Sequence, residues 1–377
     1  MSIGGMYRTA KRALRRLIHL LARPVRGDRG AGGVLIQTYR GYGWRDEIYL
    51  MGRVFQQPKI GSGLRERSPR RDLLDLFRRF LRRGVGDAVL VARFGDSAER
   101  IKADPDGYFH VRLPTGGRPS TDQLWHSVDI QLVEPAEAAA GEGANVDGHV
   151  FVAPESAQRV IISDIDDTVM FTGVVNKVMM TWRLFMQGPR SRVAFPGVAS
   201  LYRALYHGPS EDQFNPMLYV SRAPWSIYEV LEEFFRLHRI PVGPVLFLRE
   251  WGISLWRPFP RRAEDHKLIL IRDMLSLYGD LPFVLIGDSG QHDPEVYAQI
   301  VHEHPGRVVA VYIRNVSRSA GRIQAIEALA KEVMASGSTL LLAADSFSMA
   351  EHAAEIGLIP PEALAEVLRE RDAQEDV

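Results

Sequence analysis

The sequence of 377 residues contains no cysteine. Disulfide bonds, thiolate metal sites and cysteine nucleophiles are therefore excluded, and any bound metal must be held by oxygen or imidazole ligands. The sequence also lacks an apolar run that approaches the roughly 18 to 20 residues of a membrane-spanning helix. We therefore expect a chain that does not cross a membrane.

Net charge is also small, at +1 at neutral pH. This balance hides an asymmetry, because Arg and Lys crowd the front of the chain whereas Glu and Asp dominate its end. The balance does not indicate a polyanion, and we expect no nucleic-acid partner. With 46% hydrophobic residues, the chain can bury the cores of about two domains of ordinary size.

Residues 1–29 form a basic segment with helical periodicity. Apolar residues recur there at helical spacing among Arg and Lys side chains: Leu14, Leu17, Ile18 and Leu21. One interpretation is an amphipathic helix on an anionic lipid surface; the alternatives are a tail, a helix packed on its own domain, or an organellar targeting peptide. We expect a cytoplasmic protein and leave open whether it attaches peripherally to a membrane surface.

Residues 30–134 carry mostly strand signals. The apolar runs lie at 34–39, 48–55, 88–94, 108–113 and 128–132. A helical pattern at 71–83 interrupts them. This pattern favours a small β-rich, sandwich-like domain, in which we find no catalytic constellation. The Ala- and Gly-rich stretch 135–149 is predicted to be a linker.

Residues 150–345 alternate short apolar strands with helical segments. The strands are expected at 160–162, 217–220, 245–248, 283–286, 308–312 and 339–342. Such strands are buried on both faces, and helices between them make right-handed crossovers. We therefore predict an α/β fold with a doubly wound parallel sheet, in which ligands bind at the carboxyl ends of the strands. Residues 346–377 are predicted to form a helical tail.

Polar side chains stand where these strands end. The candidates lie after the first, second and fourth strands, or at the start of the helix before the fourth: Asp164, Asp166, Thr168, Ser221, Lys267, Asp288 and Asp293. Because the carboxyl ends of parallel strands lie at one edge of a sheet, we expect these side chains to converge on one crevice.

These residue types suit phosphoryl transfer, which requires an in-line nucleophile, a proton donor and positive charge around the phosphoryl oxygens. Asp164 can attack phosphorus and form an aspartyl-phosphate, while Asp166 can protonate the leaving group and later deprotonate water. Thr168, Ser221 and Lys267 can hold phosphate oxygens.

A nucleophilic carboxylate and a phosphate repel each other by several kcal/mol at about 4 Å and an effective dielectric constant of roughly 20. A divalent cation removes this repulsion. Asp164, Asp288 and a backbone carbonyl near Asp166 offer the oxygen ligands that Mg²⁺ prefers. Asp293 can orient Lys267 or a metal-bound water.

The four motifs resemble those of the haloacid-dehalogenase superfamily. They are DxDxT at 164–168, a strand-ending Ser221, Lys267 and GDxxxxD at 287–293. Their wording over roughly residues 150–345 resembles the catalytic domain of the actin-patch-associated phosphatidate phosphatase family. This resemblance implies a haloacid-dehalogenase-like Rossmannoid fold and Mg²⁺-dependent removal of phosphate from phosphatidate, or from another phosphorylated lipid, to give diacylglycerol.

Two other functions stay open at this point. The chain can be a phosphatase for a soluble phosphomonoester or a phosphoprotein, or a membrane-associated scaffold module, although an intact set of catalytic side chains argues against the scaffold. The absence of a large cap insertion and the aromatic loop at 250–260 would suit a lipid head group. The same aromatic side chains can equally pack in the core.

Overall fold

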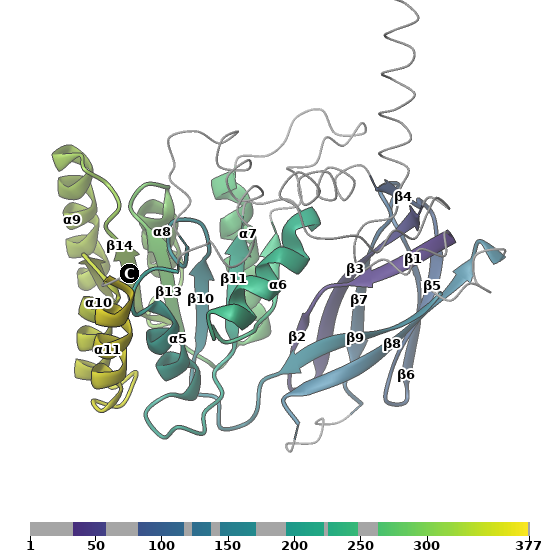
Figure 1. Cartoon of the computed structure of the whole chain (residues 1–377), viewed down its shortest axis with the longest axis horizontal. Helices are drawn as coiled ribbons and strands as arrows, with labels where there is room; N and C mark the ends of the chain where they lie inside the picture. Colours follow the sequence, from purple (N-terminus) through teal and green to yellow (C-terminus); the bar gives the residue numbers. More distant parts are fainter. Residues whose placement is uncertain are drawn as a thin grey trace, which may run out of the picture.

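The structure, a computed structural model, describes residues 33–57, 82–116, 123–136, 144–170, 194–221, 225–247 and 263–375. The basic segment 1–29, nearly all of the helical pattern at 71–83 and the aromatic loop at 250–260 lie outside these residues. Two sheets organise the chain, one built from its front half and one from the residues that follow, and they lie side by side in Figure 1. Within the described residues, we find no helix that is long and apolar enough to span a membrane.

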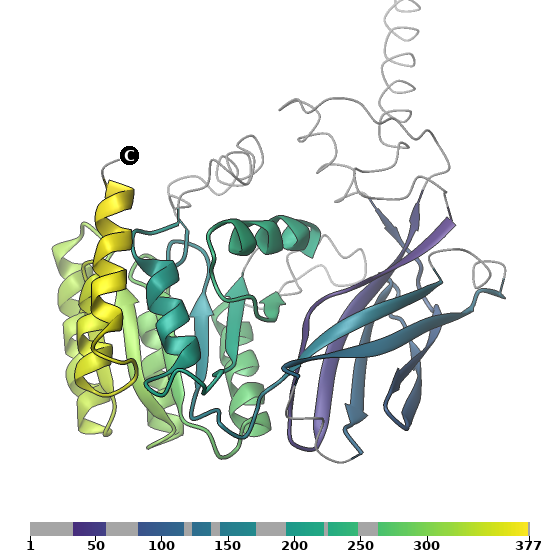
Figure 2. The same cartoon turned by 60° about the horizontal axis from the view of Figure 1, so that its bottom comes forward.

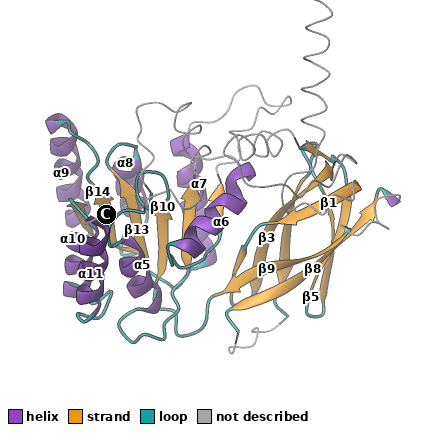
Figure 3. Ribbon diagram, viewed as in Figure 1, coloured by secondary structure: helices purple, strands orange, loops and turns teal. Residues whose placement is uncertain are grey.

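The front half forms a mixed nine-stranded sheet around a core of its own (Figure 3). Its strands are β1 Gly33–Thr38, β2 Gly41–Trp44, β3 Glu47–Gln57, β4 Arg83–Gly84, β5 Val89–Phe94, β6 Ser97–Lys102, β7 Tyr108–Pro114, β8 Trp125–Glu134 and β9 Asn145–Val152. Phe109, Val111 and Leu113 of β7 are buried, whereas the residues between them are exposed, which is the alternation of a sheet with one face on the core. This part is β-rich, as the sequence predicts.

The strand β9 extends this sheet beyond residue 134. It pairs antiparallel with β8 and parallel with β2. Residues 145–149 of β9 fall within the stretch whose composition predicts a linker, and Val150 and Val152 contribute to the core of the front half. Composition alone does not predict β9, because Ala- and Gly-rich residues precede it.

The second sheet is six-stranded and entirely parallel, which confirms the α/β class. Its strands are β10 Val160–Asp164, β11 Met217–Ser221, β12 Val245–Phe247, β13 Phe283–Asp288, β14 Val308–Arg314 and β15 Thr339–Ala343. They lie in the order β12-β11-β10-β13-β14-β15. Every residue of β10, β11 and β13 is buried, as expected for strands covered on both faces.

Helices cover both faces of the parallel sheet (Figure 2). One face carries α5 Val198–His207, α6 Tyr228–Leu237, α10 Ser346–Glu355 and α11 Ala363–Glu375, and the other carries α7 Ala263–Leu277, α8 Asp293–Glu303 and α9 Ala320–Ala335. Successive residues of β13 alternate between the two cores: Val284 and Ile286 pack with the first group, and Phe283 and Leu285 with the second. The sheet is therefore doubly wound.

The front half contacts the segment that follows β11. The ring of Tyr39 lies 4.2 Å from that of Trp225, measured between centroids. Arg40 donates its backbone N–H to the Tyr228 hydroxyl at 2.9 Å and pairs with Glu232 at 2.7 Å. The short helix η2, Trp225–Ile227, and α6 thus join the parallel sheet to the nine-stranded sheet.

Candidate active site

The candidate site lies where the order of the parallel strands reverses. β11 and β12 extend the sheet on one side of β10, whereas β13, β14 and β15 extend it on the other. Asp164 ends β10 and Asp288 ends β13, and the register pairs Ser163 with Ile286. The carboxyl ends of the strands at such a switch point form the ligand-binding crevice of open α/β sheets.

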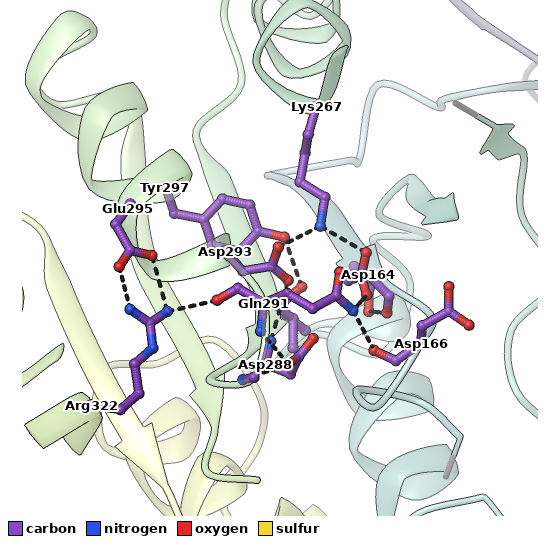
Figure 4. A network of polar contacts seen from close by, with 12 residues as sticks. Asp164, Asp166, Lys267, Asp288, Gln291, Asp293, Glu295, Tyr297 and Arg322 are labelled. Atoms are coloured by element: carbon purple, nitrogen blue, oxygen red, sulfur yellow. Dashed lines mark hydrogen bonds and ion pairs between the residues drawn. The ribbon is translucent and has the colours of Figure 1, made fainter. Parts of the chain in front are cut away.

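Lys267 connects two of the predicted aspartates (Figure 4). Its Nζ lies 2.7 Å from Asp164 Oδ1 and 2.5 Å from Asp293 Oδ1, and all three side chains are buried. Asp293 is the first residue of α8, where the helix dipole favours a negative charge. A Cβ at Gly287 would lie 2.4 Å from Asp293 Oδ2, so only glycine fits beside this carboxylate.

Asp288 adds a third buried carboxylate. Its Oδ1 accepts hydrogen bonds from the backbone N–H groups of Gly290 at 2.7 Å and Gln291 at 3.0 Å. Its Oδ2 is buried, and no hydrogen-bond partner for it exists among the described residues. Oxygen atoms of Asp164, Asp288 and Asp293 lie within 4.8 Å of one another. Three carboxylates against one ammonium leave negative charge in excess, and an all-oxygen set with a spare buried oxygen fits a hard divalent cation.

The electrostatics of the site follow from burial. Burial raises the pKa of Asp164 well above its usual value, and the charges of Asp293, Asp166 and Asp288 add to this effect against the attraction of Lys267. Burial and the charge of Asp293 raise the pKa of Asp288 to about 7. Burial lowers the pKa of Lys267, but the contacts with Asp164 and Asp293 outweigh it and raise that pKa. Lys267 is thus held protonated, while Asp164 and Asp288 need further positive charge to ionise together.

The turn after β10 carries the next two predicted residues. The backbone carbonyl of Asp166 accepts from Gln291 Nε2 at 3.2 Å, while its carboxylate points away from the Asp164 and Asp293 pair (Figure 4). Asp167 has a φ of 57°, the left-handed region that Asp tolerates in tight turns. Arg314 donates to the Thr168 carbonyl at 3.1 Å, and the buried Thr168 hydroxyl has no hydrogen-bond partner among the described residues. The turn is thus held through its backbone.

The structure brings Asp164, Lys267, Asp288 and Asp293 into one cluster. Ser221 ends β11 one residue beyond Val220, which pairs in register with Asp164, so Ser221 lies at the same edge of the sheet. Sequence reasoning missed several residues that hold this cluster in place: Tyr202, Gln291, Arg314 and Arg322. Position inside the GDxxxxD motif could have drawn attention to Gln291, and a strand-ending charge to Arg314.

A buried pair of hydroxyls holds the backbone at the end of β10. Ser163 Oγ donates to the Asp164 carbonyl at 2.7 Å, so the Tyr202 hydroxyl, 2.6 Å from Ser163 Oγ, acts as the donor to it. Tyr202→Phe is expected to lower the free energy of unfolding by about 1–3 kcal/mol, because it leaves Ser163 Oγ without a donor in a buried site. Urea denaturation measures this change.

Tyr278→Phe is the matched control. Tyr278 is fully buried too, but its hydroxyl has no hydrogen-bond partner among the described residues. Removing it should leave the unfolding free energy unchanged or raise it slightly. Equal destabilisation by the two substitutions would contradict a role for the hydrogen bond between Tyr202 and Ser163.

Residues 159–315 match the family model described as the catalytic domain of the phosphatidate phosphatase APP1. The resemblance predicted from the motifs is confirmed for this region. The matched region contains all seven predicted site residues, from Asp164 to Asp293. This region is therefore similar to a phosphatase catalytic domain.

Two fungal proteins are similar to this chain. The phosphatidate phosphatase APP1 of Saccharomyces cerevisiae is 28% identical over 225 residues, which cover 59% of this chain and 37% of that protein. The uncharacterized protein C29B5.04c of Schizosaccharomyces pombe is 30% identical over 159 residues, which cover 41% of this chain and 25% of that protein. The matches thus span well under half the length of both relatives.

Solved structures show only distant likeness. A carbohydrate acetylesterase from Xanthomonas citri, XAC1771, has a TM-score of 0.24 and 12% identity, covering 66% of this chain and 59% of that one. A ferredoxin-NADP+ reductase from Plasmodium falciparum has a TM-score of 0.20 and 9% identity, covering 75% of this chain and 96% of that one.

Proposed function

We propose that this chain is a Mg²⁺-dependent phosphatase with a haloacid-dehalogenase-type site, and that it hydrolyses phosphatidate or a related lipid phosphomonoester to diacylglycerol and phosphate. The observation that carries the proposal is Lys267 bridging Asp164 and Asp293 at the switch point, beside the spare oxygen of Asp288. The match of residues 159–315 to a phosphatidate phosphatase catalytic domain supports the choice of substrate.

Asp164 is the proposed nucleophile. Its carboxylate oxygen forms a bond to phosphorus as the bond from phosphorus to the diacylglycerol oxygen breaks, which leaves an aspartyl-phosphate. Asp166 gives its proton to the departing alkoxide. A water then attacks phosphorus, Asp166 takes up one of its protons, and inorganic phosphate leaves with Asp164 restored.

The remaining predicted residues hold the transferred group. Lys267 is protonated and buried, so its charge acts in a medium where electrostatic interactions are stronger than in water. Its ammonium favours the ionised form of Asp164, and in the proposed reaction it stabilises a phosphoryl oxygen. The buried hydroxyls of Ser221 and Thr168 lie at the same edge of the sheet and can donate to the other oxygens.

The cation would be held by Asp164, Asp288 and the Asp166 carbonyl, with Asp293 keeping Lys267 in place. Its chemistry there is charge compensation, since it offsets the repulsion between the aspartates and the substrate phosphate. This assignment explains why the cluster has more carboxylates than ammonium groups.

The proposed function also gives the other parts of the chain a role. We propose a β-rich domain ahead of a phosphatase domain and a basic segment at residues 1–29, whereas the final helices α10 and α11 pack on the parallel sheet. Because β9 belongs to the nine-stranded sheet, we propose a boundary between the domains after Val152. Peripheral attachment to an anionic membrane would bring such a site to its lipid substrate.

Phosphate release from phosphatidate in mixed micelles tests this function directly. We expect release in the presence of Mg²⁺ and its loss when EDTA is added, because the aspartate cluster then lacks its compensating charge. A soluble aryl phosphate and a phosphopeptide serve as comparison substrates. Turnover of these compounds with phosphatidate untouched would remove the lipid substrate and leave a phosphatase for soluble compounds. A wild-type protein without any phosphatase activity would contradict the proposed function.

A further inference from the structure

Gln291 joins the two oxygens on which the proposed chemistry depends. Its Nε2 lies 3.2 Å from Asp164 Oδ2 and 3.2 Å from the Asp166 carbonyl oxygen (Figure 4). Lys267 already occupies Asp164 Oδ1, at 2.7 Å. The Asp164 carboxylate is therefore held at both oxygens, by an ammonium on one side and an amide on the other.

The direction of this amide follows from the chemistry of its neighbours. A carboxylate oxygen and a backbone carbonyl are both acceptors, so the group facing them must be the NH₂ of Gln291 and not its oxygen. The amide oxygen Oε1 is buried and has no hydrogen-bond partner within the described residues. Gln291 thus uses both N–H bonds at the site while its own acceptor goes unused.

Arg322 holds the backbone from which this amide extends. From the first turn of α9, its Nη2 donates to the Gln291 carbonyl at 2.6 Å and its Nε to the Ser289 carbonyl at 2.9 Å. The same guanidinium forms a two-fold ion pair with Glu295 of α8. The guanidinium is planar and rigid, and it donates both to the backbone of the loop between β13 and α8 and to Glu295. It therefore fixes this loop against α9.

We propose that Gln291 is a positioning residue that sets the separation and direction of Asp164 Oδ2 and the Asp166 carbonyl for Mg²⁺, and that Arg322 acts through it. This inference rests on the proposed function, which assigns those two oxygens to the cation. Outer partners that orient metal ligands typically change metal affinity by about 10- to 100-fold when they are removed. Neither residue needs to contact the ion.

The test is a double-mutant cycle on Mg²⁺ affinity, measured by calorimetry on the full chain. We expect Gln291→Ala and Arg322→Ala each to weaken Mg²⁺ binding by about 10-fold or more. The double variant should bind about as weakly as the weaker single variant, because Arg322 acts only through Gln291. The proposal would be overturned if the fold-losses of Mg²⁺ affinity in the two single variants multiplied in the double variant. It would also be overturned if either single variant kept the wild-type affinity.

Arg272→Ala is the matched control for Arg322. Arg272 lies on α7 and forms the same two-fold pair with Glu303, at 2.9 and 2.7 Å, with both side chains partly exposed. It should leave Mg²⁺ affinity unchanged. Thermal unfolding in EDTA measures stability independently of Mg²⁺ binding. If Arg322→Ala lowered the stability but left the Mg²⁺ affinity intact, the role of Arg322 would be purely structural and the proposal would be refuted.

Gln291→Met separates the amide from the bulk of the side chain. A thioether has no N–H to donate to Asp164 Oδ2 or to the Asp166 carbonyl and adds no charge, so this variant should bind Mg²⁺ about as weakly as Gln291→Ala. Wild-type affinity in Gln291→Met would mean that the bulk of residue 291 matters and its amide does not, and the positioning role would be wrong. A wild type that binds no Mg²⁺ would remove the metal assignment and this inference together, whereas wild-type binding without any difference in the variants would remove the inference alone.

Discussion

Asp164→Asn is expected to slow phosphate release on the order of 10⁴-fold or more, because the amide cannot form the covalent bond to phosphorus that starts the proposed reaction. Asn is nearly isosteric with Asp, so Lys267 keeps an oxygen acceptor where it now has Asp164 Oδ1 at 2.7 Å. The substitution also removes a buried negative charge. We therefore expect a folded protein whose activity is lost, measured as phosphate release from phosphatidate in mixed micelles with Mg²⁺.

Asp273→Asn is the control for this loss. Asp273 lies on α7, the helix that carries Lys267, but its side chain is exposed and outside the site. Its substitution should leave the rate within about two-fold of the wild type, in line with the small effects of surface changes. If Asp164→Asn retained more than a tenth of the wild-type rate, another group would have to be the nucleophile.

Lys267→Met is expected to lower the free energy of unfolding by about 3–5 kcal/mol, the range seen when one partner of a buried ion pair is removed. Lys267 is only 1% exposed, and its loss leaves Asp164 and Asp293 buried without a cation between them. Chemical denaturation in EDTA measures the effect. Added Mg²⁺ should restore part of the stability, because an ion that binds the folded state alone shifts the equilibrium toward it.

An exposed lysine offers the comparison. Lys331 lies on α9 with its side chain in solvent, and Lys331→Met should change the unfolding free energy by less than about 0.5 kcal/mol. If the two lysine variants were equally stable in EDTA, the ammonium of Lys267 would not be compensating the aspartates. The charge assignment of the cluster would then have to be revised.

The sequence by itself predicts the parallel sheet and the residues at its strand ends. Strands buried on both faces must be continuous apolar runs, so β10, β11 and β13 are visible as short stretches such as Val160–Ile162. The order and register of these strands place Asp164 near Asp288. The order of the motifs along the sequence predicts the same arrangement. The roles of these residues in catalysis stay predictions.

The sequence is less informative in the front half. The strand β6, Ser97–Lys102, is a polar strand at the end of the sheet order, and β2, Gly41–Trp44, is short and contains two glycines. Neither shows the apolar alternation that identifies a strand facing a core. Such strands form because neighbouring strands offer hydrogen bonds, and this is a property of the sheet and not of the segment.

Only the tertiary structure decides which groups hold the site residues in place. Arg322 reaches Gln291 from α9, and Gln291 contacts Asp164, which lies 127 positions away in the sequence. Periodicity reports which face of an element is buried, because burial depends on spacing along one segment. A hydrogen bond between distant side chains depends on where packing directs each of them, and spacing along one segment carries no record of that direction.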